Sequence, residues 1–187
     1  MTHSLRDAHF DDLYVITEIY REAVENGVSS YELTPPSLAE MTRRFEDLTA
    51  QNYPYIVAED HAGQLLGYAY AGAYRTRPAY RWTVEDSIYL APQARGMGLG
   101  KKLLSELVQR CTRLGFRQLI AVIGGAHPAS VQVHRALGFE LTGTMRASGF
   151  KHGRWLDTTI MQLSLGEGST SDPEADSYPG TLYEKAD

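Results

Sequence analysis

A glycine-rich stretch is the part of this sequence best suited to binding an anion. In residues 95–100, RGMGLG, three glycines alternate with other residues between an apolar run and an amphipathic run. Glycine lets the backbone turn tightly, so successive amides can point at one anion, assisted by the positive end of the following helix dipole. A diphosphate is the natural ligand, and Lys101 and Lys102 would add positive charge. The alternative is that the glycines only punctuate the passage from a strand to a helix.

Two classes of nucleotide site fit this stretch poorly. A P-loop has the spacing G-x-x-x-x-G-K-[ST], whereas Gly96 and Lys101 are one residue too close and no Ser or Thr follows the lysine. A dinucleotide fold carries its glycines after the first strand and an acid about 20 residues later. Here the glycines follow the fourth expected strand, and Arg117 and Gln118 stand near the position about 20 residues later where the acid would be expected.

The elements that must position the stretch follow from the apolar periodicity. Strands are predicted at residues 3–8, 53–60, 65–75, 83–91, 117–124, 139–147 and 158–165. Helices are predicted at residues 11–27, 34–51, 101–115 and 128–138. This order predicts one α/β (α+β) domain with a mixed sheet and helices on both faces. The sheet should be antiparallel at hairpins and parallel at the two crossover helices.

Several helix ends carry recognisable signals. Ser37 and Glu40 form a capping-box pattern, in which Ser37 accepts from the amide of Glu40 and Glu40 reaches back to the amide of Ser37. Gly27 is predicted to end the first helix as a left-handed cap, and Gly115 and Gly138 are predicted to end the last two helices.

Composition indicates a globular protein of the soluble class. Of 187 residues, 43% are hydrophobic and 22% are charged, and no apolar run approaches the roughly 18 residues that span a membrane. The N-terminus lacks the apolar segment of a signal peptide, so a cytoplasmic protein is expected. The one cysteine, Cys111, lies on the apolar stripe of a predicted helix, which favours a buried structural thiol over a nucleophile.

The net charge of −5 is confined to the C-terminal segment. From residue 166 onward there are six acids and one lysine, which accounts for the whole −5. Residues 1–165 are therefore neutral overall, and nothing calls for a nucleic-acid or membrane partner. Residues 166–187, rich in Gly, Ser, Pro and acids, are predicted to be a mostly disordered, solvated tail. The alternative is that Tyr178, Leu182 and Tyr183 dock on a surface.

The glycine stretch also matches a family motif. Residues 95–100 resemble the [QR]-x-x-G-x-[GA] element of the GNAT superfamily of N-acetyltransferases, whose amides hold the pyrophosphate of acetyl-CoA. The flanks AYRWTVEDSIYL (79–90), HPASVQVHRALGF (127–139) and GFKHGRWLDTTIMQL (149–163) resemble the phosphinothricin acetyltransferase group, including relatives that act on methionine sulfoximine and methionine sulfone. The resemblance covers about residues 3–165.

The resemblance implies both a fold and an activity. It implies the GNAT fold, a mostly antiparallel mixed sheet in one domain over residues 1–165, and an acyltransferase with acetyl-CoA as acyl donor and no metal. It further implies a small-molecule amine acceptor, a homodimer, and a role in antibiotic or herbicide resistance. By the same resemblance, the residues that bind acetyl-CoA are Ile88, Tyr89, Leu90, Arg95, Gly96, Met97, Gly98, Leu99, Gly100, Lys101, His127 and Ser130.

Amine acetylation needs a base, an oxyanion donor and a proton for the leaving thiolate. Glu85 lies just before the glycine turn and, as in the resembling enzymes, is the expected base; Asp86, on the other face of the strand, is expected to point outward. The amide of Leu90 is the implied oxyanion donor. His134 occupies the place from which the family's proton donor acts, and imidazole suits that role at neutral pH. The alternative for His134 is a structural histidine.

Two positions depart from the family pattern. His127 stands where the resembling enzymes usually have an asparagine that contacts the cofactor, which puts the cofactor contact there in question. Arg95 stands where many members carry other polar residues, although a backbone role is unaffected.

The acceptor site is expected on the loop at 73–82. Arg75 and Arg77 can bind carboxylates or phosphinates bidentately. The resemblance adds Tyr80 from this loop, and Tyr31 from another, to the acceptor site; the alternative is a solvated basic loop. The stretch KHGRWLD (151–157) is expected to be a hairpin that serves packing and dimer contacts.

Three functions remain open from the sequence. The first is acetylation of the α-amine of a phosphinothricin-like, methionine sulfoximine-like or methionine sulfone-like amino acid. The second is acetylation of another small amine, because a fold does not identify the acceptor. The third is a non-catalytic acyl-CoA-binding module, against which the presence of both Glu85 and His134 argues.

Overall fold

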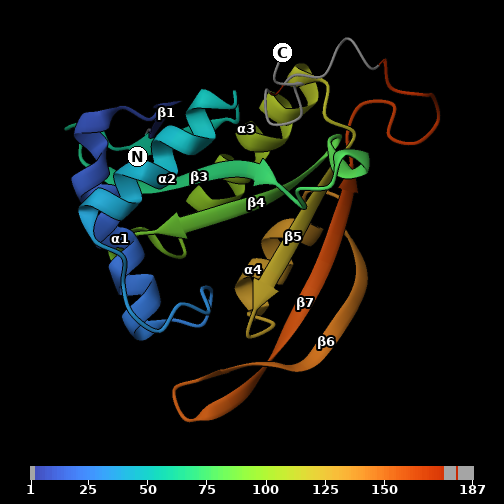
Figure 1. Cartoon of the computed structure of the whole chain (residues 1–187). Helices are drawn as coiled ribbons and strands as arrows, with labels where there is room; N and C mark the ends of the chain where they lie inside the picture. The colour runs from blue at the N-terminus through green and yellow to red at the C-terminus, as the bar shows by residue number, and fades with distance from the viewer. Residues whose placement is uncertain (1–2, 175–179, 181–187) are drawn as a thin grey trace.

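One seven-stranded sheet organises the computed structural model of the chain, which describes residues 3–174 and 180 (Figure 1). The strand order is β1-β2-β3-β4-β5-β7-β6. The strands are β1 (Ser4–Asp7), β2 (Tyr55–Glu59), β3 (Leu65–Ala73), β4 (Thr83–Leu90), β5 (Gln118–Gly124), β6 (Glu140–Lys151) and β7 (Arg154–Ser164). The α-helices are α1 (Leu13–Asn26), α2 (Leu38–Ala50), α3 (Leu99–Leu114) and α4 (Pro128–Arg135). The predicted mixed, mostly antiparallel sheet is confirmed.

The prediction of parallel pairing at both crossover helices is half wrong. Among the described strands, β4 and β5 are parallel neighbours, connected by α3. Strands β5 and β6, connected by α4, are not neighbours, because β7 lies between them and pairs antiparallel with both. The hairpin that joins β6 to β7 therefore decides the order at this side of the sheet.

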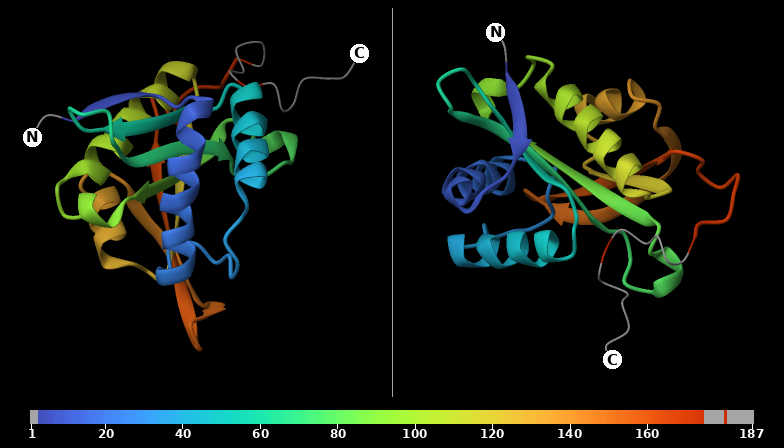
Figure 2. Two further views of the ribbon diagram at one scale, coloured as in Figure 1. Left: turned by 90° about the vertical axis from the view of Figure 1, so that its left-hand side faces the viewer. Right: turned by 90° about the horizontal axis from the view of Figure 1, so that it is seen from above.

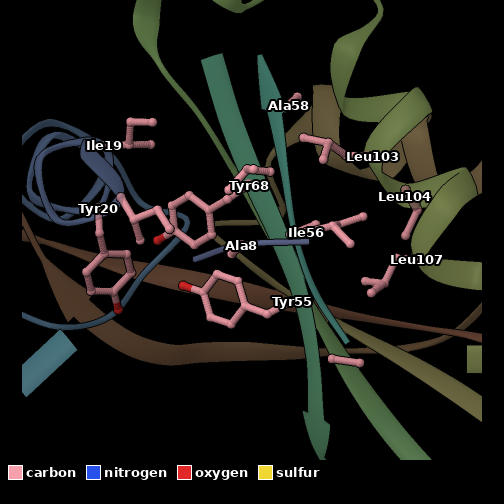
Figure 3. Close-up of a cluster of buried hydrophobic side chains, with 14 of the residues drawn as sticks. Ala8, Ile19, Tyr20, Tyr55, Ile56, Ala58, Tyr68, Leu103, Leu104 and Leu107 are labelled. Carbon is pink, nitrogen blue, oxygen red and sulfur yellow. The ribbon is translucent and has the colours of Figure 1, made fainter. Parts of the chain in front are cut away.

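The helices cover both faces of the sheet. Helices α1 and α2 pack on one face and α3 and α4 on the other, as the view from above shows (Figure 2). Alternation along β2 sends Tyr55 toward α1 and Ile56 toward α3, where Leu103, Leu104 and Leu107 are fully buried (Figure 3). The expected burial of Cys111 on the α3 stripe is confirmed, and burial raises the pKa of its thiol to about 12.

A cluster of tyrosines fills the face under α1. The hydroxyls of Tyr20, Tyr55 and Tyr68 point toward one another (Figure 3), beside a cavity of about 20 Å³ that they line together with Tyr70. Tyr20 bonds Ser30 and Glu32, whereas the fully buried Tyr68 hydroxyl has no protein partner among the described residues. A buried hydroxyl without a partner costs stability, so the packing of the ring must compensate for it.

The helix ends agree with the sequence in part. The Ser37 side chain accepts from the Glu40 amide at 3.2 Å, but the second half of the predicted capping box is wrong, because the Glu40 carboxylate bonds Arg43 and Arg44 rather than reaching back. Gly115 caps α3 with a left-handed φ of 93° as predicted, whereas α4 ends at Arg135 with Ala136 as its C-cap, so the left-handed Gly138 follows the helix without capping it. The prediction for the glycine after α1, at position 27, is wrong, because its φ of −114° and ψ of 176° are extended. The chain leaves α1 there by straightening into a loop.

The last two strands are longer than predicted. Strands β6 and β7 run through the stretch expected to connect them, and the hairpin turns at His152 and Gly153, whose φ values are 51° and 72°. Phe150 pairs with Trp155 across the ladder, with their rings edge to face. The buried Lys151 donates to the carbonyl of Ser30 at 2.8 Å, so the hairpin is tied to the loop after α1.

The first part of the C-terminal segment is ordered. Residues 166–174 form turns, and the Arg117 guanidinium lies 3.2 Å from the Ser171 hydroxyl and 3.5 Å from the Glu167 carboxylate. The mostly disordered tail expected at residues 166–187 stays a prediction. Tyr178, Leu182 and Tyr183 lie outside the described residues. Within residues 3–174 and 180, none of the helices is both long and apolar enough to cross a membrane.

Candidate active site

Strands β4 and β5 separate immediately after Glu85. Their ladder pairs Thr83–Glu85 with Gln118–Ile120 and then ends, although β4 continues to Leu90. The Ala91 amide donates to Leu66 of β3 at 2.9 Å. Because peptide groups alternate along a strand, the Leu90 amide points away from β3, to the side that β5 has left. The backbone of Ile88 and Leu90 is thus available to an extended ligand.

The glycine turn follows directly and begins α3. Gly96 and Gly98 have φ of 78° and 76°, and Gly98 is the N-cap of the helix. A Cβ added at either glycine meets nothing within 4 Å, so backbone conformation rather than crowding favours glycine here. The first amides of α3 have no acceptor within the helix, and Lys101 and Lys102 are exposed beside them. This geometry fits the diphosphate site predicted from the sequence.

The other side chains of the turn serve different purposes. The Arg95 guanidinium forms an ion pair with Glu22 of α1 and lies 3.5 Å from the carbonyl oxygen of Leu90. Leu99 is buried in the core, whereas Met97 is 44% exposed. Arg95 therefore braces the turn against α1, and a ligand would meet the backbone of the turn and the Met97 side chain.

Glu85 has the protonation behaviour of a base that works at neutral pH. Its side chain is partly buried on the face of the sheet that carries α1 and α2, opposite Gly72 of β3. Burial, followed by the negative charge of Asp86, raises the pKa of Glu85 to about 7, and the nearby positive charge of Arg75 opposes the rise. A carboxyl group with this pKa can both accept and release a proton near pH 7.

The prediction that Asp86 points outward is wrong. Asp86 is 8% exposed, and its Oδ2 lies 3.0 Å from Nε2 of His134. It faces α3 and α4, because side chains alternate along a strand and Glu85 takes the other face. The sequence did carry a signal for this: Asp86 stands between Val84 and Ile88 on the apolar face of β4, where a charged side chain needs a partner.

His134 lies on the opposite face of β4 from Glu85. It is 4% exposed, and its Nδ1 lies 2.7 Å from the carbonyl of Ser130, whose hydroxyl is 3.5 Å from the same nitrogen. The structure therefore brings His134 together with Ser130 and Asp86, and not with Glu85. His127 is the exposed N-cap of α4 and makes no side-chain capping bond.

Tyr31 connects the loop after α1 to the far side of the sheet. Its hydroxyl accepts from the Gly125 amide at 3.1 Å and lies 2.8 Å from the Thr158 hydroxyl and 3.1 Å from the Asp157 carbonyl. Its ring packs so closely that a Cβ at Gly149 would lie 2.6 Å from it. The hydroxyl predicted to line the acceptor site is thus occupied by the protein itself.

The loop between β3 and β4 places one arginine near Glu85. The charge of Arg75 acts on Glu85, and its guanidinium lies 4.3 Å from the centre of the Tyr74 ring. Tyr80 is 40% exposed and contacts Tyr74 edge to face, and Arg77 is exposed at the start of a short 3-10 turn. Of the predicted acceptor residues, Arg75 is the one whose charge acts on Glu85.

Comparison with known proteins gives a consistent result. Residues 5–160 match the acetyltransferase (GNAT) domain. The chain is 46% identical over 172 residues to the phosphinothricin N-acetyltransferase of Alcaligenes faecalis, which covers 91% of this chain and 87% of the relative. It is 44% identical over 165 residues to the L-methionine sulfoximine/L-methionine sulfone acetyltransferase of Pseudomonas aeruginosa, with coverage of 88% and 96%.

The solved structures agree. A GNAT superfamily phosphinothricin acetyltransferase from Sinorhizobium meliloti, in complex with acetyl-CoA, superposes with a TM-score of 0.96 at 65% identity, over 99% of this chain and 100% of that one.

Proposed function

The chain belongs to the acetyltransferase (GNAT) family, and from this membership we propose that it acetylates the α-amine of a small amino-acid analogue of the phosphinothricin, methionine sulfoximine or methionine sulfone type. The chain is an acyltransferase with acetyl-CoA as its donor. The observation that carries the acceptor and mechanism proposal is the position of Glu85. Its carboxyl, with a pKa of about 7, lies where β4 loses its β5 partner, a few residues before the glycine turn.

We assign the binding of acetyl-CoA, the acyl donor, to backbone groups of the chain. The amides that open α3 at Gly98 would hold the diphosphate, and the free backbone of Ile88 and Leu90 would pair with the extended arm. Bound there, acetyl-CoA supplies the thioester that is broken. The amide of Leu90 would donate to the carbonyl oxygen as that oxygen becomes negative, which would lower the barrier for attack.

Glu85 starts the reaction by accepting a proton from the ammonium group of the acceptor, directly or through water. The neutral amine then attacks the thioester carbonyl, so that a C–N bond forms and the C–S bond breaks in a direct transfer. Formation of the amide releases a second proton from the nitrogen, which protonates the departing thiolate to give the thiol, and the proton held by Glu85 passes to solvent. Arg75, close to Glu85, would bind an acidic group of the acceptor and so hold its amine near the base.

A homodimer is part of this proposal. Strand β6 is an edge of the sheet, and it exposes Leu141, Met145 and Phe150 next to Trp155 of β7, each between 49% and 67% exposed. A long apolar edge strand that stayed uncovered would promote aggregation. A second copy of the chain would cover it, and light scattering after size exclusion tests this: a monomeric mass at working concentrations would exclude the dimer.

The activity is tested by thiol release. The protein is mixed with acetyl-CoA and, in separate reactions, L-phosphinothricin, L-methionine sulfoximine, L-methionine sulfone or unrelated small amines. Thiol is followed with a chromogenic reagent, and the N-acetyl product is identified by mass spectrometry. We expect thiol release with at least one of the amino-acid analogues. If unrelated amines are acetylated and all three analogues are not, the acceptor assignment is wrong.

A further inference from the structure

His134 is enclosed by hydrogen-bond acceptors. Its Nδ1 faces the carbonyl of Ser130 at 2.7 Å, and its Nε2 faces the carboxyl of Asp86 at 3.0 Å. A carbonyl oxygen can only accept, so Nδ1 carries a hydrogen. A second proton must lie between Nε2 and Oδ2, because a bare nitrogen cannot bond a carboxylate. Asp86 and His134 thus form a pair that is neutral overall and holds one shared proton.

The pair is shielded from water. The side chains of His134 and Asp86 are 4% and 3% exposed, and the ring of Phe139 packs edge-on against the imidazole at 4.9 Å. Oδ1 of Asp86 has no partner among the described residues, so the bond to His134 is the hydrogen bond that holds this carboxyl. Loss of either member would leave a buried polar or charged group unpaired, which is strongly destabilising.

The pair lies at the point where β4 loses its partner strand β5. The ladder between β4 and β5 ends at Glu85 and Ile120, so Asp86 is the first residue of β4 beyond it. From here to Leu90, no strand among the described residues pairs with β4 on the β5 side. The bond from Asp86 to His134 ties this part of β4 to α4 instead.

We propose that Asp86 is a positioning residue which, through His134, fixes the segment of β4 that follows Glu85 and carries the Leu90 amide. His134 acts as an anchor with both ring nitrogens engaged, rather than as the proton donor for the leaving thiolate. Giving up its Nε2 proton would leave the buried Asp86 carboxylate without a hydrogen bond. This inference rests on the proposed acetyl transfer.

Three titratable groups face Asp86. Glu85 precedes it on β4, Cys111 faces it from α3, and His134 faces it from α4. Arg75, on the loop before β4, acts on Glu85. Although burial acts to lower the pKa of His134, the bonds to Asp86 and Ser130 raise it.

Two substitutions separate the hydrogen bond from the shared proton. In Asp86→Asn, the amide can donate to the unprotonated Nε2 of a neutral imidazole, which keeps the anchor without the shared proton. Asp86→Ala removes both. Asp11→Asn, on an exposed turn before α1, is the matched control.

We expect Asp86→Ala to lower kcat/KM by about tenfold or more, because small displacements of catalytic groups are costly. Asp86→Asn should keep most of the activity, because its amide keeps the bond to His134. Equal losses in both variants would overturn the proposal. If Asp86→Ala does not fold, a loss of about tenfold or more in Asp86→Asn, whose amide still holds His134, would overturn it.

A measurement that does not depend on turnover tests the anchor independently of the proposed function. In ¹⁵N NMR of the full chain near pH 7.5, both ring nitrogens of His134 should be protonated, and in Asp86→Asn only Nδ1 should be. An unprotonated Nε2 in the unsubstituted chain would contradict the shared proton. If no acceptor is acetylated, the proposed function fails, while the NMR result and the calorimetric affinity of Asp86→Ala for acetyl-CoA still test the anchor.

Discussion

Glu85→Gln replaces a partly desolvated carboxyl by a neutral side chain of the same shape, and it should change both turnover and stability. General-base catalysis contributes about 10² to 10⁴ in rate, so kcat at pH 7 should fall by about 100-fold or more. The affinity for acetyl-CoA should remain within about twofold, because the glycine turn and the backbone of β4 bind the donor without this carboxyl.

The stability change follows from the raised pKa. The unfolded chain loses the Glu85 proton near its ordinary value of 4.5, but the folded chain holds it to about 7. The free energy of unfolding therefore decreases as the pH rises through this interval. The full difference between the two pKa values corresponds to a decrease of about 3 kcal/mol. Because the side chain keeps some contact with water, we expect about 1 to 2 kcal/mol. Glutamine carries no charge, so the variant avoids this loss.

The assay is urea unfolding of both proteins at about pH 4.5 and about pH 8.5, followed by tryptophan fluorescence. The two should have similar stability at the lower pH, where the carboxyl is protonated in the folded state and only about half ionised in the unfolded state, and the variant should be more stable at the higher pH. Glu46→Gln, on the exposed face of α2, controls for the loss of one negative charge. A stability difference that is the same at both pH values, or unchanged turnover at pH 7, would refute the reasoning.

The remaining predictions concern the donor site, a helix cap and the tyrosine cluster. Gly98→Val should weaken acetyl-CoA binding by about tenfold or more in calorimetry, because a β-branched residue disfavours φ of 76°; Gly143→Val, at a strand position with open space, should bind normally. Ser37→Ala should lower the unfolding free energy by about 1 kcal/mol, since it removes the bond to the Glu40 amide. Tyr68→Phe should leave thermal stability unchanged or raise it, because it removes an unpartnered buried hydroxyl, whereas Tyr20→Phe, which loses two hydrogen bonds, should lower the melting temperature.

Much of the fold could be predicted because local signals were strong. The apolar stripe of α3 and the alternating or continuous apolar runs of the strands record which faces are buried, and burial depends on side chains within one element. Gly115 ended α3 as predicted. The glycine after α1 did not adopt the predicted left-handed cap, since the direction in which a chain leaves a helix depends on where the next element packs.

The sheet order was less predictable. Residues 149–157 contain glycine, histidine and aromatic residues in a pattern that suits either a loop or strand ends. Pairing with the partner strand extended both β6 and β7 to the turn at His152 and Gly153, and placed β7 beside β5. A sequence records the strands but not which edge a long hairpin will pair with, because that choice is made by non-local hydrogen bonds.

By itself, the sequence determined the chemical groups of the site and their order along the chain: a carboxylate before a glycine turn, and a histidine on the helix that follows β5. These are local properties, set by residue type and spacing. The tertiary structure alone decided which groups meet. It left Glu85 partly buried on one face of β4 at the end of the ladder with β5, and it paired Asp86 with His134 on the other face. The physical reason is that a side chain's charge state and partners depend on solvent exclusion and on contacts between distant segments, and neither exists until the sheet and helices pack.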